Sequence, residues 1–316
     1  MSTYQKYKPA WQQLLIFGTL TIGLFLTLSI IAVMIIAKVY GLPPLELATM
    51  DLTNPSIFAA SKILQAVSTV SLFLVPSLVF AYLSDKQPMK YAGFRPPVPM
   101  AFYFIAVILI LSCFPMVSWL NEMNQQIHLP KGLEATEKLM RDAEAKSNDF
   151  LRKFLNMKSP ADLGVMLLVL AVLPAISEEL FFRGILQRIF IQLTTRPWAG
   201  IIITAIVFSA LHGQFLGFVP RMVLGMVLGA LYWYSGSLFP GIIAHFLNNA
   251  IQVVVVYYRP DMLDKEPEFS AALIAGSTIL VILITWWMKK ISQTSYAEVY
   301  DTDDDFHIGP RDQYIA

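Results

Sequence analysis

Residues 163–193 read LGVMLLVLAVLPAISEELFFRGILQRIFIQL. The segment is apolar enough to lie in a bilayer, yet its middle carries two adjacent carboxylates, Glu178 and Glu179, followed by Arg183. Because the apolar pattern continues on both sides of these charges, we expect one long helix with the glutamates near its midpoint. Charged side chains at such a depth are costly and are usually functional or paired. We therefore expect the fold and the chemistry to be organised around this helix.

The composition of the whole chain is that of a membrane protein. Of its 316 residues, 56% are hydrophobic and 14% are charged, and the mean hydropathy is +0.58. A soluble domain is nearer about one quarter charged. Apolar runs long enough to cross a bilayer recur along the sequence, so we expect an all-α, polytopic membrane helix bundle of about eight transmembrane helices. The expected helices are residues 14–37, 63–83, 100–120, 160–193, 197–214, 220–235, 240–258 and 271–288.

Both termini are expected to be cytoplasmic. An even number of crossings puts the two ends of the chain on the same side of the membrane. Basic residues gather on that side, including Lys6, Lys86 and Lys289, and such residues are enriched on the cytoplasmic side of membrane proteins. We expect a multi-pass integral protein of the bacterial inner (plasma) membrane, in contact with the lipid bilayer.

The chain divides into three expected parts. Residues 1–13 form a cytoplasmic N-terminal segment, residues 14–291 form a membrane-embedded domain, and residues 292–316 form an acidic, mobile tail. Residues 121–159 carry apolar side chains at helical spacing among charges, which indicates an amphipathic extramembrane helix or helix pair packed on the membrane surface or on the bundle.

The three charges near the middle of the central helix, Glu178, Glu179 and Arg183, differ in their expected partners. Residues four apart on a helix share a face, whereas neighbours differ by about 100° in direction. Glu179 and Arg183 therefore face each other and can neutralise each other, while Glu178 points elsewhere. A carboxylate without a partner in a low-dielectric site is suited to act as a general base on water. The alternative is that Glu179 and Arg183 only lock the helix and that Glu178 faces the headgroups.

Polar residues in two later apolar segments are candidates for the same site. His212 lies about as far after the turn near Thr195 as the glutamates lie before it, so an antiparallel helix pair would bring them to similar depth. His245 and Asn249 are four residues apart and share one helix face. Both can donate hydrogen bonds, and donors aimed at one point would stabilise the oxyanion of a tetrahedral intermediate.

Two glycine patterns bear on how these helices pack. Gly225 and Gly229 have the small-xxx-small spacing that allows helix backbones to approach closely. His245 follows closely after the preceding turn, so that turn must be sunk into the protein if His245 is to reach the depth of the glutamates. Gly236, Gly241 and the absence of charge permit such a buried turn.

Zinc is the alternative chemical explanation of the polar residues. Two histidines with glutamates could supply ligands, but no His-Glu-x-x-His motif occurs at any of the four histidines. We therefore expect no cofactor, with zinc as the alternative. The net charge of +1 gives no sign of a nucleic-acid partner, and the sequence does not indicate an oligomeric state.

Three motifs, in this order on successive hydrophobic helices, resemble the CPBP family. This family contains the type II CAAX prenyl endopeptidases and their bacterial relatives, including abortive-infection and bacteriocin-immunity proteins. The resemblance covers residues 160–258; the N-terminal half is similar only in its number of helices. The motifs are Glu178-Glu179-x-x-x-Arg183, Phe208-x-x-x-His212 and His245-x-x-x-Asn249.

The resemblance implies a glutamate-dependent, metal-independent intramembrane endopeptidase. Residues 14–291 are then expected to be a membrane-embedded protease domain, with residues 160–258 as its catalytic core. By motif position, Glu178 would activate the water, supported by the other two charged residues of its motif. His212 would help to hold the water, and His245 with Asn249 would form the oxyanion site.

Three functions are consistent with the sequence. The first is a protease acting on a membrane-associated protein or peptide, and an unprenylated substrate is favoured because prenylated CAAX proteins are not expected in bacteria. The second is a non-catalytic bacteriocin-immunity or scaffold protein, in which Glu178 would be dispensable. The third is a proton-coupled transporter, because intramembrane carboxylates and histidines also relay protons; it would predict an internal repeat, and none is evident.

Overall fold

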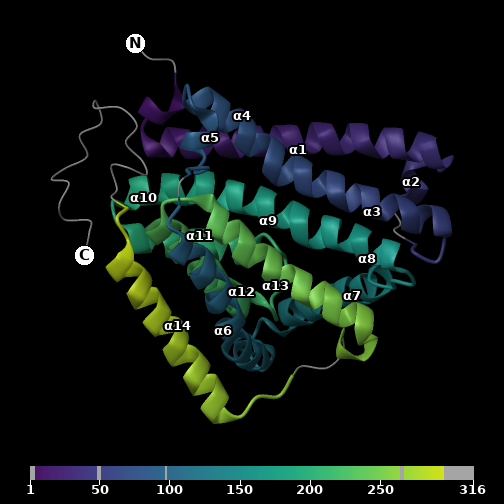
Figure 1. Ribbon diagram of the computed structural model, residues 1–316. Helices are drawn as coiled ribbons and strands as arrows, with labels where there is room; N and C mark the ends of the chain where they lie inside the picture. Colours follow the sequence, from purple (N-terminus) through teal and green to yellow (C-terminus); the bar gives the residue numbers. More distant parts are fainter. Residues whose placement is uncertain (1–3, 48–50, 97, 264–266, 295–316) are drawn as a thin grey trace.

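The computed structural model describes residues 4–47, 51–96, 98–263 and 267–294. Every regular element in these ranges is helical, which confirms the all-α class (Figure 1). The elements are α1 (Ala10–Tyr40), α2 (Pro44–Leu47), α3 (Pro55–Thr69), η2 (Val70–Leu74), α4 (Val75–Ser84), α5 (Pro88–Tyr91), α6 (Met100–Gln125), α7 (Glu134–Phe154), α8 (Pro160–Leu167), η3 (Leu168–Val172), α9 (Leu173–Glu178), η4 (Glu179–Gln187), α10 (Arg188–Thr194), α11 (Pro197–Ala210), α12 (Phe218–Ser235), α13 (Leu238–Tyr258) and α14 (Ala271–Ile291), with short 3₁₀ turns at Gln5–Tyr7 and Pro260–Leu263.

Six stretches of helix are long and apolar enough to cross a membrane. The helices expected at 197–214 and 220–235 are present as α11 and α12, but neither belongs to that set. The 14 residues of α11 rise about 21 Å, less than the hydrocarbon core of about 30 Å. The part of the chain that the structure describes therefore contains six candidate spans, where about eight were expected. They are Ala10–Tyr40, Pro55–Ser84, Met100–Gln125, Pro160–Thr194, Leu238–Tyr258 and Ala271–Ile291.

The central helix is continuous from Pro160 to Thr194, as the sequence predicts. Ser159 caps its start by accepting a hydrogen bond from the backbone N–H of Asp162. Two wider π-helical segments, η3 and η4, interrupt the α-helical turns, and η4 begins at Glu179. Such segments are rare and occur often at functional sites. The helix runs between the α1–α4 layer and α11–α13, so η4 is buried along its whole length (Figure 1).

The close approach expected at Gly225 and Gly229 is confirmed. A Cβ built on Gly229 would lie 2.7 Å from the side-chain oxygen of Gln187 on η4, and one built on Gly225 would lie 3.1 Å from Cβ of Ala205 on α11. A Cβ at position 229 would force Gln187 to shift, and one at position 225 would require Ala205 to give way by a few tenths of an ångström. The two glycines therefore allow α12 to pack directly against α11 and the central helix.

The turn between α12 and α13 is buried, as the position of His245 requires. Ser237 and Leu238 are 1% and 0% exposed. The backbone N–H of Leu238 donates a hydrogen bond of 2.9 Å to the carbonyl of Gly93, which follows α5. Because this turn lies inside the bundle, His245 reaches the level of Glu179.

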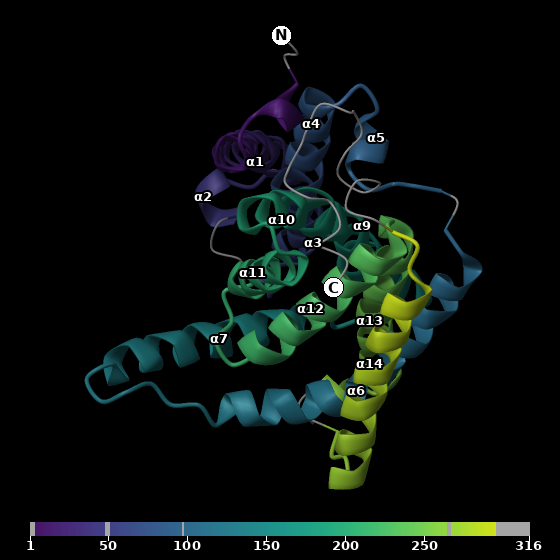
Figure 2. The same ribbon diagram turned by 90° about the vertical axis from the view of Figure 1, so that its left-hand side faces the viewer.

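The segment expected to be amphipathic forms one helix, α7, rather than a helix pair (Figure 2). Its C-terminal end is anchored by Phe154, which is buried in a cluster with Met166 and Val253. Glu144 of α7 accepts a hydrogen bond of 2.9 Å from the backbone N–H of Leu216, which follows α11. The helix is thus packed on the bundle, and the first part of the expected segment is a continuation of α6 to Gln125.

The described ends of the chain lie at the same end of the bundle (Figure 1). Lys6, before α1, forms an ion pair of 2.8 Å with Asp85 at the end of α4. Ser292, after α14, donates a hydrogen bond of 2.7 Å to the carbonyl of Tyr234 at the end of α12. The start of α1 and the end of α14 therefore lie at the same end of the bundle. The expected acidic tail lies outside the described residues from position 295 onward.

Candidate active site

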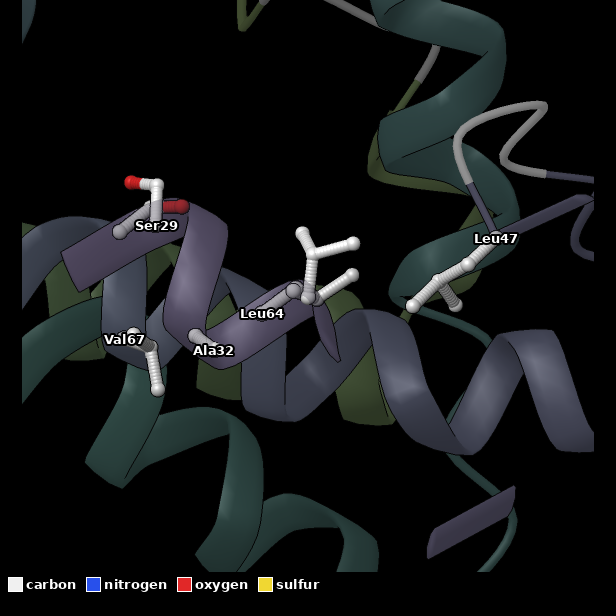
Figure 3. Close-up of a pocket in the computed structure, with 7 residues that line it drawn as sticks. Ser29, Ala32, Leu47, Leu64 and Val67 are labelled. Atoms are coloured by element: carbon white, nitrogen blue, oxygen red, sulfur yellow. The ribbon is translucent and has the colours of Figure 1, made fainter. Parts of the chain in front are cut away.

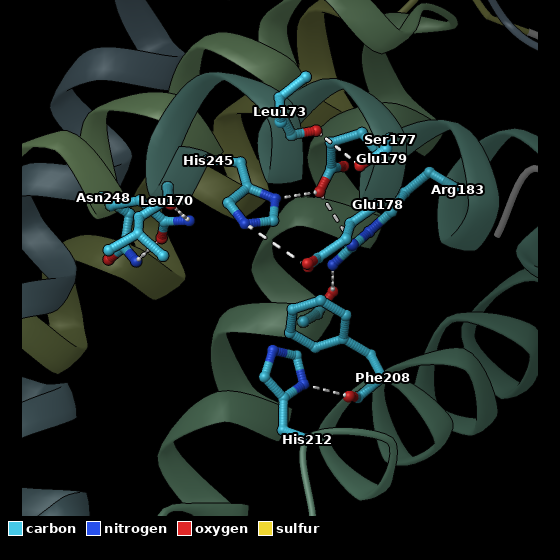
Figure 4. A network of polar contacts seen from close by, with 12 residues as sticks. Leu170, Leu173, Ser177, Glu178, Glu179, Arg183, Phe208, His212, His245 and Asn248 are labelled. Atoms are coloured by element: carbon cyan, nitrogen blue, oxygen red, sulfur yellow. Dashed lines mark hydrogen bonds and ion pairs between the residues drawn. The ribbon is translucent and has the colours of Figure 1, made fainter. Parts of the chain in front are cut away.

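A buried hydrogen-bond network joins the central helix to α13 (Figure 4). Glu179 Oε1 accepts hydrogen bonds of 2.9 Å from Arg183 Nη1 and of 2.8 Å from His245 Nδ1. The side chains of Glu179 and Arg183 are 0% exposed. The pairing of Glu179 with Arg183 confirms the expected contact across one helical turn, and His245 joins it from a helix that the sequence alone could not orient.

The environment of Glu179 is shaped by glycines. Arg183 Nη2 donates a hydrogen bond of 3.1 Å to the carbonyl of Gly225 on α12. The second oxygen of Glu179, Oε2, faces Gly241 on α13, where an added Cβ would lie only 3.1 Å away. Any side chain at position 241 would therefore crowd the carboxylate.

Glu178 lies on the Nε2 side of the His245 ring (Figure 4), and within the described residues it forms no ion pair with Arg183. Its Oε2 lies 3.9 Å from His245 Nε2, which is longer than a hydrogen bond. Since a carboxylate accepts, the proton of His245 lies on Nδ1, between the ring and Glu179, and Nε2 presents its lone pair towards Glu178. Glu178 is 8% exposed, so it is accessible where Glu179 is not.

His212 lies at the edge of the site, in the turn after α11. Its Nδ1 donates a hydrogen bond of 2.8 Å to the carbonyl of Phe208, and the two rings are 4.9 Å apart. The ring of Phe208 also lies 6.2 Å from that of His245, so it borders both imidazoles. Within the described ranges, His212 makes no hydrogen bond to Glu178 or Glu179, and its side chain is exposed.

Asn249 is not brought into contact with the glutamates. Its Nδ2 donates a hydrogen bond of 3.1 Å to the carbonyl of Leu170 in η3, and its Oδ1 accepts one of 3.0 Å from Asn248. The amide therefore ties α13 to the central helix on the side of the molecule next to His245.

The residues of the site do not form a zinc centre. No group of three His, Cys, Asp or Glu side chains that could hold a metal ion occurs among the residues that the structure describes. His245 Nδ1 is committed to Glu179, which leaves Nε2 and the Glu178 carboxylate as the nearest pair of donors. Catalytic zinc sites use three protein ligands.

A separate cavity of about 250 Å³ lies between α1, α2 and α3 (Figure 3). Leu47, Leu64 and Val67 are among its walls, and Ser29 and Ser68 contribute its polar side chains. Its lining residues include no carboxylate or imidazole, so the cavity is separate from the polar network around Glu179 and His245.

Residues 160–251 match a family model described as type II CAAX prenyl endopeptidase Rce1-like. This part of the chain is an Rce1-like domain. The domain includes the glutamates, His212, His245 and Asn249, and it confirms the family resemblance of the three motifs.

Two curated bacterial proteins are similar to part of the chain. The uncharacterized protein YpbD of Bacillus subtilis (strain 168) is 28% identical over 106 residues, which are 32% of this chain and 51% of that protein. An uncharacterized 24.3 kDa protein of Escherichia coli is 29% identical over 100 residues, or 30% of this chain and 46% of that protein. The chain spans about half the length of the curated relatives it matches. No solved structure matches the chain significantly.

One residue of the Rce1-like domain was missed by sequence reasoning. Arg221 lies in the first turn of α12 and interacts electrostatically with Glu178 and His212. Its Nη2 donates a hydrogen bond of 2.5 Å to Gln214 Oε1. The available signal was a lone charged residue within the apolar run 218–234, which is a mark of function in membrane proteins.

Proposed function

We propose that this protein is a glutamate-dependent intramembrane endopeptidase that hydrolyses a peptide bond of a membrane-associated protein or peptide. The observation that carries the proposal is the placement of Glu178 beside His245. The opposite ring nitrogen of His245 is hydrogen-bonded to Glu179, which is itself paired with the buried Arg183. The Rce1-like domain supports the same reaction class. The catalytic set is Glu178, Glu179, Arg183, His212, His245 and Asn249.

Glu178 acts as the general base. The 3.9 Å between its Oε2 and His245 Nε2 is a distance that one water molecule can bridge with a hydrogen bond to each. Glu178 takes a proton from this water while the water oxygen attacks the carbonyl carbon, which produces a tetrahedral oxyanion. When the C–N bond breaks, Glu178 returns the proton to the departing amine, so atoms and charges balance.

The histidines and the asparagine have supporting roles. Glu179 and Arg183 fix the tautomer and the orientation of His245, so that Nε2 faces the water. His212, whose Nε2 is not used by the bond to Phe208, helps to hold the water or the substrate. Asn249 joins the oxyanion site when its bond to the Leu170 carbonyl opens on substrate binding.

The membrane arrangement belongs to the same proposal. Helices α11 and α12 form a hairpin within the membrane that, with the six candidate spans, gives about eight membrane helices; α11 is shorter than the hydrocarbon core, so the loop after it lies below the membrane surface. Both termini are cytoplasmic, and the protein resides in a bacterial inner membrane. Substrates reach the site from the bilayer or its surface. The assay below compares prenylated and unprenylated peptides and so tests whether prenylation is needed.

The test is a cleavage assay on purified protein with quenched fluorescent peptides that carry prenylated and unprenylated C-terminal sequences. Wild type and Glu178→Ala are compared in chelator and with added zinc. We expect cleavage that survives chelator and is lost in Glu178→Ala. Cleavage that is lost in chelator and restored by zinc would show metal catalysis instead. An intact cellular phenotype in Glu178→Ala would favour an immunity, scaffold or transport protein.

A further inference from the structure

The guanidinium of Arg221 is desolvated and only partly bonded. Nη2 donates to Gln214 Oε1, whereas Nη1 is buried without a hydrogen-bond partner in the described part of the chain. A buried guanidinium N–H without a partner is unfavourable, because its hydration is lost and nothing replaces it. The arrangement is explained most simply if a further acceptor binds there.

The carboxylates near Arg221 are committed elsewhere. Glu144 attracts Arg221 electrostatically, but its Oε2 accepts the backbone N–H of Leu216 at 2.9 Å. Glu178 also attracts Arg221 and is the proposed general base. Among the described residues, no carboxylate oxygen lies within 4.0 Å of a nitrogen of the Arg221 guanidinium, so Arg221 forms no ion pair there.

The position of Arg221 is suited to substrate rather than to structure alone. It lies in the first turn of α12, at the same edge of the site as His212, and it interacts electrostatically with both His212 and Glu178. A planar guanidinium matches a carboxylate with two parallel hydrogen bonds, which no amide or hydroxyl can reproduce. A negatively charged group placed here would therefore both satisfy Nη1 and offset the charge of Arg221.

We propose that Arg221 is a specificity residue that binds a carboxylate of the substrate, either its free C-terminus or an acidic side chain next to the cleaved bond. This inference rests on the proposed function, since it assigns the bound peptide to the same site. Gln214 orients the guanidinium by accepting the hydrogen bond from Nη2. The carboxylate docks on Arg221 while the peptide bond to be cleaved lies towards Glu178 and His245.

Binding is measured with the full-length protein in the inactive Glu178→Gln background, so that the result does not depend on cleavage. Three peptides of one sequence are compared: one with a free C-terminal carboxylate, one with a C-terminal amide, and one with a C-terminal amide and a single glutamate. With Arg221 intact, we expect at least one carboxylate peptide to bind about tenfold or more tightly than the plain amide peptide, because the plain amide cannot form the charge-assisted hydrogen bonds to Arg221. The arm that gains affinity identifies the source of the carboxylate.

Arg221→Gln should remove this preference and leave the affinity of the plain amide unchanged within about twofold. Arg221→Lys should retain part of it, and Arg259→Gln, an exposed arginine paired with Asp261 after α13, is the matched charge control. Equal affinity for all three peptides, no measurable binding of any, or a preference that persists in Arg221→Gln would overturn the inference. Cleavage by wild type together with equal binding would refute the role of Arg221 alone and leave the proposed protease intact.

Discussion

Glu179 and His245, 66 positions apart in the sequence, share a hydrogen bond of 2.8 Å inside the bundle. The bond fixes the His245 proton on Nδ1 and turns Nε2 towards Glu178. One buried carboxylate thus positions the imidazole, and its sequence neighbour remains available for proton transfer. The two adjacent glutamates have different tasks because consecutive residues of a helix point in different directions.

Removal of the Glu179 charge should destabilise the protein through Arg183. In Glu179→Gln, the guanidinium stays buried without its counter-charge, and the expected loss of stability is about 3–5 kcal/mol. The measurement is thermal or denaturant unfolding of the purified protein in detergent.

The double variant Glu179→Gln, Arg183→Met is the matched test of that cause. It removes both charges, so part of the lost stability should return, although activity should not. If Glu179→Gln alone unfolds at the wild-type temperature, the buried pair does not hold the site together.

Substitution of Gly229 should disturb the contact between α12 and the central helix. In Gly229→Ala, the new methyl group would lie 2.7 Å from Gln187 Oε1 and 2.9 Å from Ile201 Cγ2, so the helices must separate or Gln187 must leave the Gly229 carbonyl. We expect a loss of about 1–3 kcal/mol, as for other overpacked interiors.

Gly276→Ala on α14 is the control, since nothing lies within 4 Å of its added Cβ. Alanine is the better helix former, so this variant should be as stable as wild type or slightly more stable. Equal effects of the two substitutions would contradict the packing argument.

Local sequence rules predict the parts of the site that lie on one helix. The continuous helix through Glu178 follows from the apolar pattern on both sides, and the Glu179–Arg183 contact follows from their spacing of four residues. The buried turn before His245 follows from glycines and missing charge. Each of these depends on a few neighbouring residues only.

Contacts between helices could not be predicted in the same way. The bond from Asn249 to Leu170 and the position of Arg221 depend on how α12 and α13 rotate against the central helix. The π-helical segment η4 also shifts the side chains after Glu179 away from the regular period of 3.6 residues. On α13, a helical wheel places Asn249 on the same face as His245, but it does not show which group on the central helix the Asn249 amide contacts.

Membrane orientation is tested with single cysteines in a Cys113→Ser background, since Cys113 is the one cysteine of the chain. A membrane-impermeant maleimide is applied to intact cells that carry Lys138→Cys on α7 or Lys289→Cys on α14, both exposed. With cytoplasmic termini, Lys138→Cys should react in intact cells and Lys289→Cys only after permeabilisation.

The opposite labelling pattern would reverse the orientation and place His212 on the cytoplasmic side. Leu211→Cys, at the exposed end of α11, separately tests whether the end of the α11–α12 hairpin is open to water. It should label from the same side as Lys138→Cys. Protection from both sides would mean that the bilayer closes off the end of this hairpin.

The start of α7 should loosen at low pH. The pKa of Glu137 lies at about 2, below its ordinary value of 4.5, because the backbone N–H of Leu129 donates to it, followed by Arg141 and His128. A lowered pKa adds stability that is present above the ordinary value and is lost as the pH falls towards about 2. Amide hydrogen exchange of residues 126–133, which precede α7, should therefore become faster over that range, while exchange within α7 changes less.

Glu137→Gln should produce the same fast exchange at neutral pH, because the amide accepts these bonds more weakly. Glu122→Gln, at an exposed position on α6, is the control and should leave exchange unchanged. Unchanged protection of Leu129 in Glu137→Gln would refute the anchoring role of this carboxylate.

The most direct test of the account is the turnover of Glu178→Gln on the best peptide of the cleavage assay, with unfolding measured on the same sample. The substitution keeps the shape of the side chain and removes its ability to take a proton from water. We expect kcat to fall by about 10²–10⁴-fold while the unfolding temperature stays at that of wild type. A variant that cleaves at the wild-type rate would show that Glu178 is not the general base and would contradict the proposed mechanism.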